Sequence, residues 1–209
     1  MDLTRFWALL DALPAPADAE ALYDATTPQG ALRRANLERY LALVAGTGTA
    51  LIAEAPGWRG ATVTGVPFVS VRELTVRPGR LTGRADGDGF LVPPQPAAEW
   101  EASAAFVQRA LAAWPGRPPV CWGAYPHHPF VSGDPRTNRT PRPAEVRGGA
   151  PVALELLAAL GIRDVVAVGR KAQGALAAAG IEAVAVRHPA QGGATLFAAQ
   201  MAALAAART

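Results

Sequence analysis

The chain has 209 residues, of which 50% are hydrophobic and 18% charged, as in a soluble domain with a sizeable core. No apolar run reaches the roughly 20 residues of a membrane-spanning helix, and the first residues lack a signal-peptide pattern. We therefore expect a cytoplasmic, monomeric protein that forms a single domain over residues 1–209, with no membrane partner. Of its 20 cationic residues, 19 are arginines. Arginine suits phosphate binding, but a compositional bias explains these counts equally well.

The first half of the chain predicts helices followed by one buried strand. Apolar residues recur at helical spacing within residues 1–46, and Gly46 interrupts the pattern. Residues 49–54 are a short apolar run typical of a buried strand, after which Pro56 and Gly57 require a turn. Residues 58–96 are rich in Gly and Pro with little periodicity, so we expect a long loop there.

The second half of the chain predicts helices and strands in alternation. The predicted helices cover residues 97–114, 151–160 and 170–179 and an alanine-rich C-terminal segment, and the predicted strands cover residues 119–124, 164–168 and 182–186. This alternation predicts an α/β fold, a three-layer α/β/α arrangement around a central parallel sheet of about four strands.

Three Gly- and Pro-rich loops follow the predicted strands, at residues 55–70, 126–141 and 188–193. Because ligands bind where parallel strands end, these loops predict a pocket at one edge of the sheet. All three histidines, His127, His128 and His188, lie in these loops. His188 directly follows a strand, where its imidazole could donate a hydrogen bond to a developing oxyanion. With Cys121 as the only cysteine, we expect no metal site.

The usual enzyme motifs are absent, whereas four segments resemble the uracil-DNA glycosylase superfamily. There is no dinucleotide-binding fingerprint, phosphate-binding loop or nucleophile elbow. The four resembling segments, in the family's order, are Glu54-Ala55-Pro56-Gly57 followed by Thr64-Gly65-Val66-Pro67-Phe68, then Asn138-Arg139-Thr140-Pro141, then Val168-Gly169-Arg170-Lys171-Ala172, and finally Arg187-His188-Pro189 with Gly192-Gly193. The second segment is similar to the iron–sulfur branch, but a single cysteine cannot hold a cluster, so no cofactor is expected.

The resemblance implies a DNA glycosylase of base-excision repair, which flips a base out of DNA and hydrolyses its bond to the sugar. It implies that the flipped base meets Ala55, Pro56 and Gly57, stacks on Phe68 and lies against Gly123. His188 would stabilise charge on the leaving base. Glu54, with Glu73 as the alternative, would activate water. The residues implied in DNA contact are Arg139, Arg170, Arg187, Gln191, Gly192 and Gly193.

The sequence departs from the family at two positions. Family members carry an asparagine that reads the uracil edge where this chain has Gly123, and many carry an aspartate where it has Ala55. Neither Asn138 nor Gln191 obviously replaces the amide, and an asparagine at position 123 is expected to restore it. Two alternatives therefore stay open: a catalytically weak paralogue that binds DNA or a flipped base, and an α/β protein that binds a small nucleotide or base.

Overall fold

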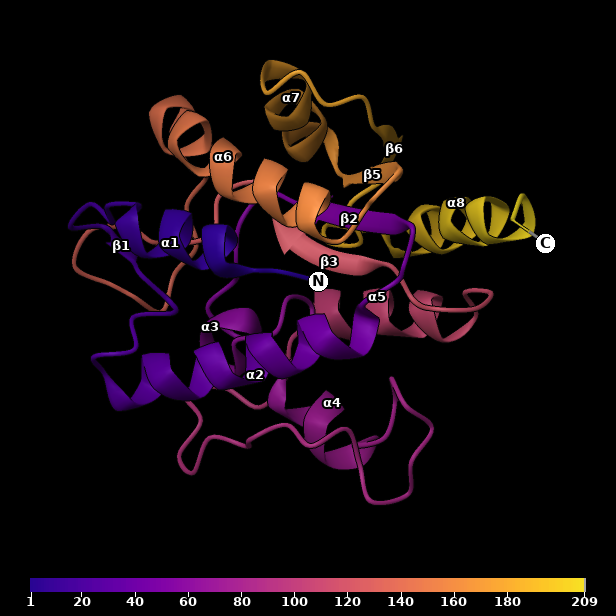
Figure 1. Ribbon diagram of the computed structural model, residues 1–209, viewed down its shortest axis with the longest axis horizontal. Helices are drawn as coiled ribbons and strands as arrows, with labels where there is room; N and C mark the ends of the chain where they lie inside the picture. The colour runs from indigo at the N-terminus through magenta and orange to yellow at the C-terminus, as the bar shows by residue number, and fades with distance from the viewer. Residues whose placement is uncertain (209) are drawn as a thin grey trace.

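The computed structural model describes residues 1–208 and is built around a four-stranded parallel sheet (Figure 1). The strands are β2 (Thr49–Ala53), β3 (Val120–Gly123), β5 (Asp164–Val168) and β6 (Val184–Val186), in the order β3-β2-β5-β6. Every neighbouring pair is parallel. The predicted fold class is thereby confirmed.

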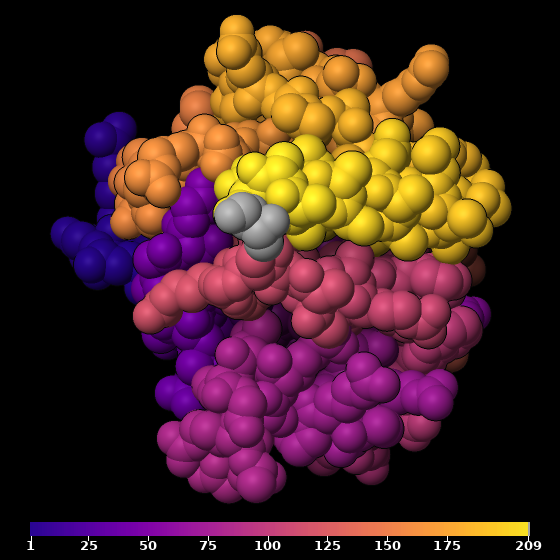
Figure 2. Space-filling view, turned by 90° about the vertical axis from the view of Figure 1, so that its right-hand side faces the viewer, coloured from indigo at the N-terminus to yellow at the C-terminus, as the bar shows by residue number. Residues whose placement is uncertain are grey.

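Helices cover both faces of the sheet, because alternate residues along each strand enter different cores. Ile52 and Trp122 join one core with residues of α1 (Thr4–Ala12), α2 (Pro28–Val44), α6 (Pro143–Ala159) and α7 (Arg170–Ala178). Leu51 and Cys121 join the other with residues of α5 (Ala102–Ala112) and α8 (Ala194–Ala206). Figure 1 shows α6 and α7 on one side of the sheet and α5 on the other. In Figure 2, α8 crosses the surface between the β5–β6 region and α5.

The predicted helical region 1–46 is wrong in its middle part. Between α1 and α2 lies the short strand β1 (Ala19–Glu20), which pairs antiparallel with β4 (His128–Pro129). Pro14 and Pro16 explain the interruption, because proline lacks the amide hydrogen that a helix interior needs. This pairing ties the N-terminal segment to the loop after β3.

The predicted loop 58–96 contains two short helices, α3 (Ala61–Thr64) and α4 (Val71–Val76). Both are too short to show helical periodicity in the sequence. Helix α6 begins at Pro143, well before the predicted residue 151, and contains Pro151 in its interior. Among residues 1–208, no helix has the length and apolar character that crossing a membrane requires.

Candidate functional site

A cavity of about 1050 Å³ opens where the parallel strands end. Each of the four strands contributes a wall residue at or near its carboxyl end, namely Ala53, Gly123, Val168 and Val186. The loops that follow these strands supply most of the remaining wall. This position is the usual ligand site of parallel α/β sheets.

The structure brings the sequence-predicted base-binding residues together in this cavity. The loop Ala55–Gly57 after β2, Phe68 after α3, Gly123 and His188 all line it. Glu54, the sequence candidate for water activation, lines it as well. The role of each residue remains a prediction, but their convergence from segments far apart in the chain is a property of the fold.

Backbone strain is also concentrated at this cavity. Within residues 1–208, the non-glycine residues with positive φ are Phe68, at 55°, and Gln191, at 53°, and both line the cavity. A left-handed backbone at such a residue costs on the order of 1–3 kcal/mol and is found preferentially at functional sites. The Gln108 side chain holds Phe68 in place by donating from Nε2 to its carbonyl oxygen at 3.0 Å.

His188 is positioned as a neutral hydrogen-bond donor. Its Nδ1 accepts a hydrogen bond from the Ala190 amide at 3.1 Å, so the proton of the neutral ring lies on Nε2. Burial, and then the charge of Arg187, lower the pKa of His188. Nε2 has no hydrogen-bond partner within residues 1–208. Gly169, with φ of 92°, allows this arrangement, because a Cβ there would lie 3.1 Å from the His188 Cβ.

The carboxyl groups of the site differ from those expected. Glu73 does not line the cavity, and its side chain accepts hydrogen bonds from the Ser70 amide and hydroxyl at the start of α4. Glu73 is therefore a helix cap rather than the alternative water-activating group. Glu54 lies 3.7 Å from Lys171 Nζ; burial raises the pKa of Glu54, and Lys171 opposes that rise.

Sequence reasoning missed Glu101, which lines the cavity from the residue preceding α5. Burial, and then the nearby charge of Glu73, raise the pKa of Glu101 to about 7, while Arg59 opposes the rise. A lone acidic residue at the start of a helix is usually a solvated cap. No local signal in the sequence therefore distinguished Glu101 from its neighbour Glu99.

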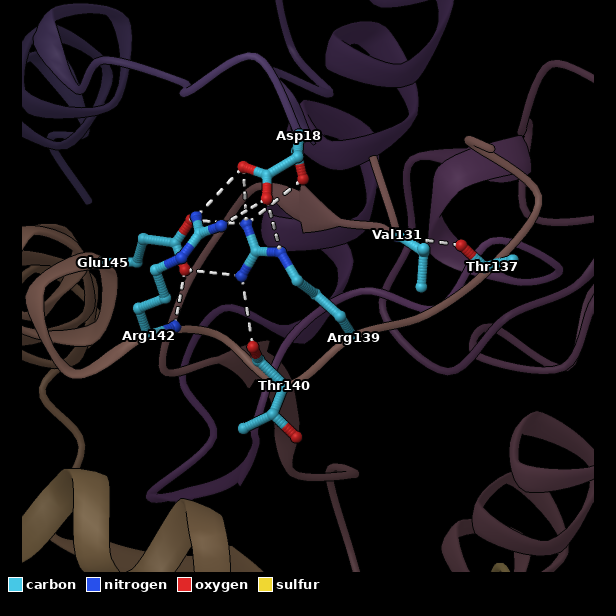
Figure 3. Close-up of polar contacts among 7 residues, drawn as sticks. All are labelled: Asp18, Val131, Thr137, Arg139, Thr140, Arg142 and Glu145. Atoms are coloured by element: carbon cyan, nitrogen blue, oxygen red, sulfur yellow. Dashed lines mark hydrogen bonds and ion pairs between the residues drawn. The ribbon is translucent and has the colours of Figure 1, made fainter. Parts of the chain in front are cut away.

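Arg139 is held in an ion-pair network, which corrects its predicted role as a phosphate contact (Figure 3). Its Nη2 lies 3.0 Å from Asp18 Oδ1 and 2.6 Å from Glu145 Oε1, and its Nε and Nη1 also donate to these carboxylates. Arg142 contacts both carboxylates too. With every guanidinium nitrogen engaged, Arg139 secures the loop after β3 to the N-terminal segment.

The cavity wall also carries cations with few partners. Arg170, Lys171 and Arg187 all line the cavity and are exposed. The Arg170 side chain has no hydrogen bond or ion pair within residues 1–208. The Arg187 side chain has one long contact of 3.5 Å, from Nη2 to the Gln191 carbonyl. The Arg170 and Arg187 side chains are therefore free to meet an anionic ligand, whereas Lys171 Nζ donates to Thr140 Oγ1 and lies 3.7 Å from Glu54 Oε1.

The two glycines after His188 lie outside the cavity wall. Gly192 is exposed with φ of 74°, and a Cβ there would have nothing within 4 Å. Gly193 is buried, and a Cβ there would overlap the His188 carbonyl oxygen. Gly192 therefore remains available for close approach by a ligand, whereas Gly193 is required by the turn itself.

Gly123 has no room for the asparagine side chain of the family. A Cβ at this position would lie 2.8 Å from the Tyr125 carbonyl oxygen, so the expected rescue by asparagine fails on steric grounds. Asn138, which the sequence did not single out as a replacement, lines the cavity. Its Oδ1 accepts a hydrogen bond from the Trp58 amide at 3.0 Å, which leaves Nδ2 without a partner within residues 1–208.

The remaining histidines support the loops. His127 Nε2 lies 3.0 Å from the Leu13 carbonyl oxygen, and His128 Nδ1 lies 3.0 Å from that of Pro56 in the cavity wall. Within residues 1–208, no group of three or more His, Cys, Asp or Glu side chains is placed to hold a metal ion.

The cavity thus combines an aromatic ring, a neutral imidazole donor, two carboxyl groups and an exposed cationic side. These groups suit a planar polar ligand that is attached to an anion. No model of a known protein family matches the sequence, and no curated protein matches it either.

Proposed function

We propose that the protein is a DNA glycosylase that hydrolyses the N-glycosidic bond of uracil or another deaminated base in DNA. The observation that carries this proposal is the meeting of Phe68, the neutral His188 donor and two carboxyl groups in one cavity. The resemblance of the wall segments to the uracil-DNA glycosylase motifs supports the same reaction.

In the proposed reaction the base leaves the duplex stack and enters the cavity. Phe68 stacks on its ring, while the loop Ala55–Gly57 packs against it and excludes water. As the bond to C1′ breaks, its electron pair passes to the base and negative charge develops on a carbonyl oxygen. His188 Nε2–H donates a hydrogen bond to that oxygen, which stabilises the transition state more than the ground state.

The exposed cations account for the DNA backbone in this proposal. Arg170 and Arg187 contact phosphates that flank the extruded nucleotide, and Lys171 adds a further positive charge near Glu54. A carboxyl group of the wall orients the water that attacks C1′. The products are an abasic site and the free base.

One observation favours a second candidate, a catalytically weak paralogue that binds DNA or a flipped base. Gly123 has neither an amide side chain nor space for one, so an expected contact to the base edge is missing. The loss of one such hydrogen bond costs on the order of 1–3 kcal/mol.

A cleavage assay separates the two candidates. Oligonucleotides carrying uracil, hypoxanthine or xanthine, single-stranded and mismatched, are incubated with wild type and with His188→Ala, and strand breaks at abasic sites are quantified. Release of at least one base that His188→Ala slows supports the glycosylase. DNA binding in a mobility-shift assay without release of any base supports the paralogue.

A further inference from the structure

Glu101 occupies a place in the cavity wall that glycines have left open. A Cβ on Gly57 would lie 2.5 Å from Glu101 Oε1, and a Cβ on Gly60 would overlap Glu101 Oε2. Side chains at either position would therefore displace the carboxyl group. Although it lies so close to the loop, the Glu101 carboxyl group has no hydrogen bond or ion pair within residues 1–208.

Asn138 places a hydrogen-bond donor beside this carboxyl group. The same Cβ position on Gly57 lies 3.9 Å from Asn138 Nδ2. The Trp58 amide fixes the other end of the side chain, because it donates to Oδ1 at 3.0 Å. A partner-free donor and a partner-free acceptor therefore lie near the same point beside Gly57, and both line the cavity. This is an arrangement that can hold and orient one water molecule.

The charges around Glu101 suit a group that exchanges a proton near neutral pH. Two charged residues affect the pKa of Glu101: Glu73 of α4 raises it, and Arg59, before α3, lowers it. Burial adds the largest contribution and raises the pKa of Glu101 to about 7. By contrast, Glu54 has Lys171 as an ionic partner at 3.7 Å. A general base works best when its pKa lies near the working pH.

We propose that Glu101 is the general base of the site and that Asn138 positions the water that Glu101 activates. This inference rests on the proposed glycosylase function. It assigns to Glu101 the general-base role that the motifs predicted for Glu54. The Glu101 carboxylate removes one proton from the water as its oxygen forms a bond to C1′. The C1′–N bond breaks at the same time, and its electron pair leaves with the base, held by His188. The base then takes up a proton, so that water is divided between the two products.

The test compares three glutamate variants in the cleavage assay across pH 5–9. Glu101→Gln keeps the shape of the side chain and removes its basicity, so release of the base should fall by about 100-fold or more. Glu99→Gln, at an exposed position outside the cavity, is the matched control and should behave as wild type. Glu54→Gln should slow the reaction less than Glu101→Gln.

The pH profile adds a result that a merely structural role would not produce. Wild-type kcat/KM should rise with pH with a midpoint near pH 7, and Glu101→Gln should lose this rise. Glu73→Gln retains an acceptor for the α4 cap but removes the neighbouring charge, so the midpoint of the rise should move to lower pH. Asn138→Ala should lower kcat about 10-fold without moving that midpoint.

The two proposals fail in different ways. If wild type releases a nucleobase and Glu101→Gln matches it in rate and pH profile, Glu101 is not the general base and the glycosylase function stands. If Glu54→Gln alone abolishes release, the general base is Glu54. If wild type releases no base from any oligonucleotide, both the function and this inference are overturned.

Discussion

The arginines of the cavity wall fall into two groups with opposite roles. Arg139 is surrounded by Asp18 and Glu145, and all its guanidinium nitrogens have partners. Arg170 and Arg187 line the same cavity without an ion pair within residues 1–208. The residue type is the same, but Arg139 holds two chain segments together, whereas Arg170 and Arg187 remain free for a ligand. What an arginine does here is decided by the carboxylates within its reach.

The largest predicted effect is the loss of stability on removal of the Arg139 side chain. Arg139→Ala leaves Glu145 without its main partner and Asp18 with Arg142 alone, and it should lower the free energy of unfolding by roughly 2–4 kcal/mol. Urea unfolding at pH 7 measures the difference. Arg136→Ala, an exposed arginine of the same loop, is the control and should change stability by less than about 0.5 kcal/mol. Equal losses for the two variants would mean that the network contributes no stability.

The partner-free donor of the cavity wall, His188 Nε2, should matter for catalysis instead. His188→Ala removes the neutral donor, and it should raise the barrier to base release by about 2–4 kcal/mol, or roughly 30- to 1000-fold in rate. Single-turnover cleavage gives the rate, and a mobility-shift assay checks that DNA binding is retained. A fully active His188→Ala variant would show that another group stabilises the leaving base.

Glu101 should show what a carboxyl group without a partner does to stability. Because folding raises the pKa of Glu101 to about 7, the folded state binds the proton more tightly than the unfolded state. Wild type should therefore lose stability as pH rises from about 5 to 8, and Glu101→Gln should remove this loss. The gain of the variant at pH 8 should be roughly 1–3 kcal/mol and should vanish at pH 4.

Asp18 provides the control of opposite sign. Its hydrogen bond to Arg142, and then the contacts with Arg139, hold the pKa of Asp18 well below its usual range despite partial desolvation. Its contribution to stability is present above about pH 4 and is lost as the solution is acidified below that value. Asp18→Asn should flatten the acid side of the stability profile while Glu101→Gln flattens the neutral side. The same slope for both variants would contradict this account of the two carboxyl groups.

The smallest predicted effects are the changes that single arginine substitutions make to the salt dependence of DNA binding. Binding should weaken steeply with salt, because cations that contact phosphates release counterions. Arg170→Ala and Arg187→Ala should each reduce the slope of log K against log salt by about 1. Arg139→Gln should leave that slope unchanged, because its guanidinium already has protein partners. A flat salt dependence for wild type would exclude DNA as the ligand.

Local patterns were sufficient for the elements with strong signals of their own. Strand 164–168 was predicted with the bounds that the structure has, because its apolar run is closed on both sides by turn residues. The cavity-lining loop 55–57 and His188 could also be identified, since their motifs are contiguous in the chain. Short elements such as α3 and β1 were missed, because two to four residues carry no detectable period.

The sequence by itself determined the fold class, the edge of the sheet where the cavity opens, and several of the residues that line it. These follow from hydrophobic patterns and turn residues, which act over a few neighbouring positions. Only the tertiary structure decided which charged groups have partners. Arg139 meets Asp18 across 121 positions of the chain, and Glu101, the residue before α5, meets Gly57 in the loop after β2. Charge interactions depend on distance and burial in space, and neither quantity is encoded in the local sequence.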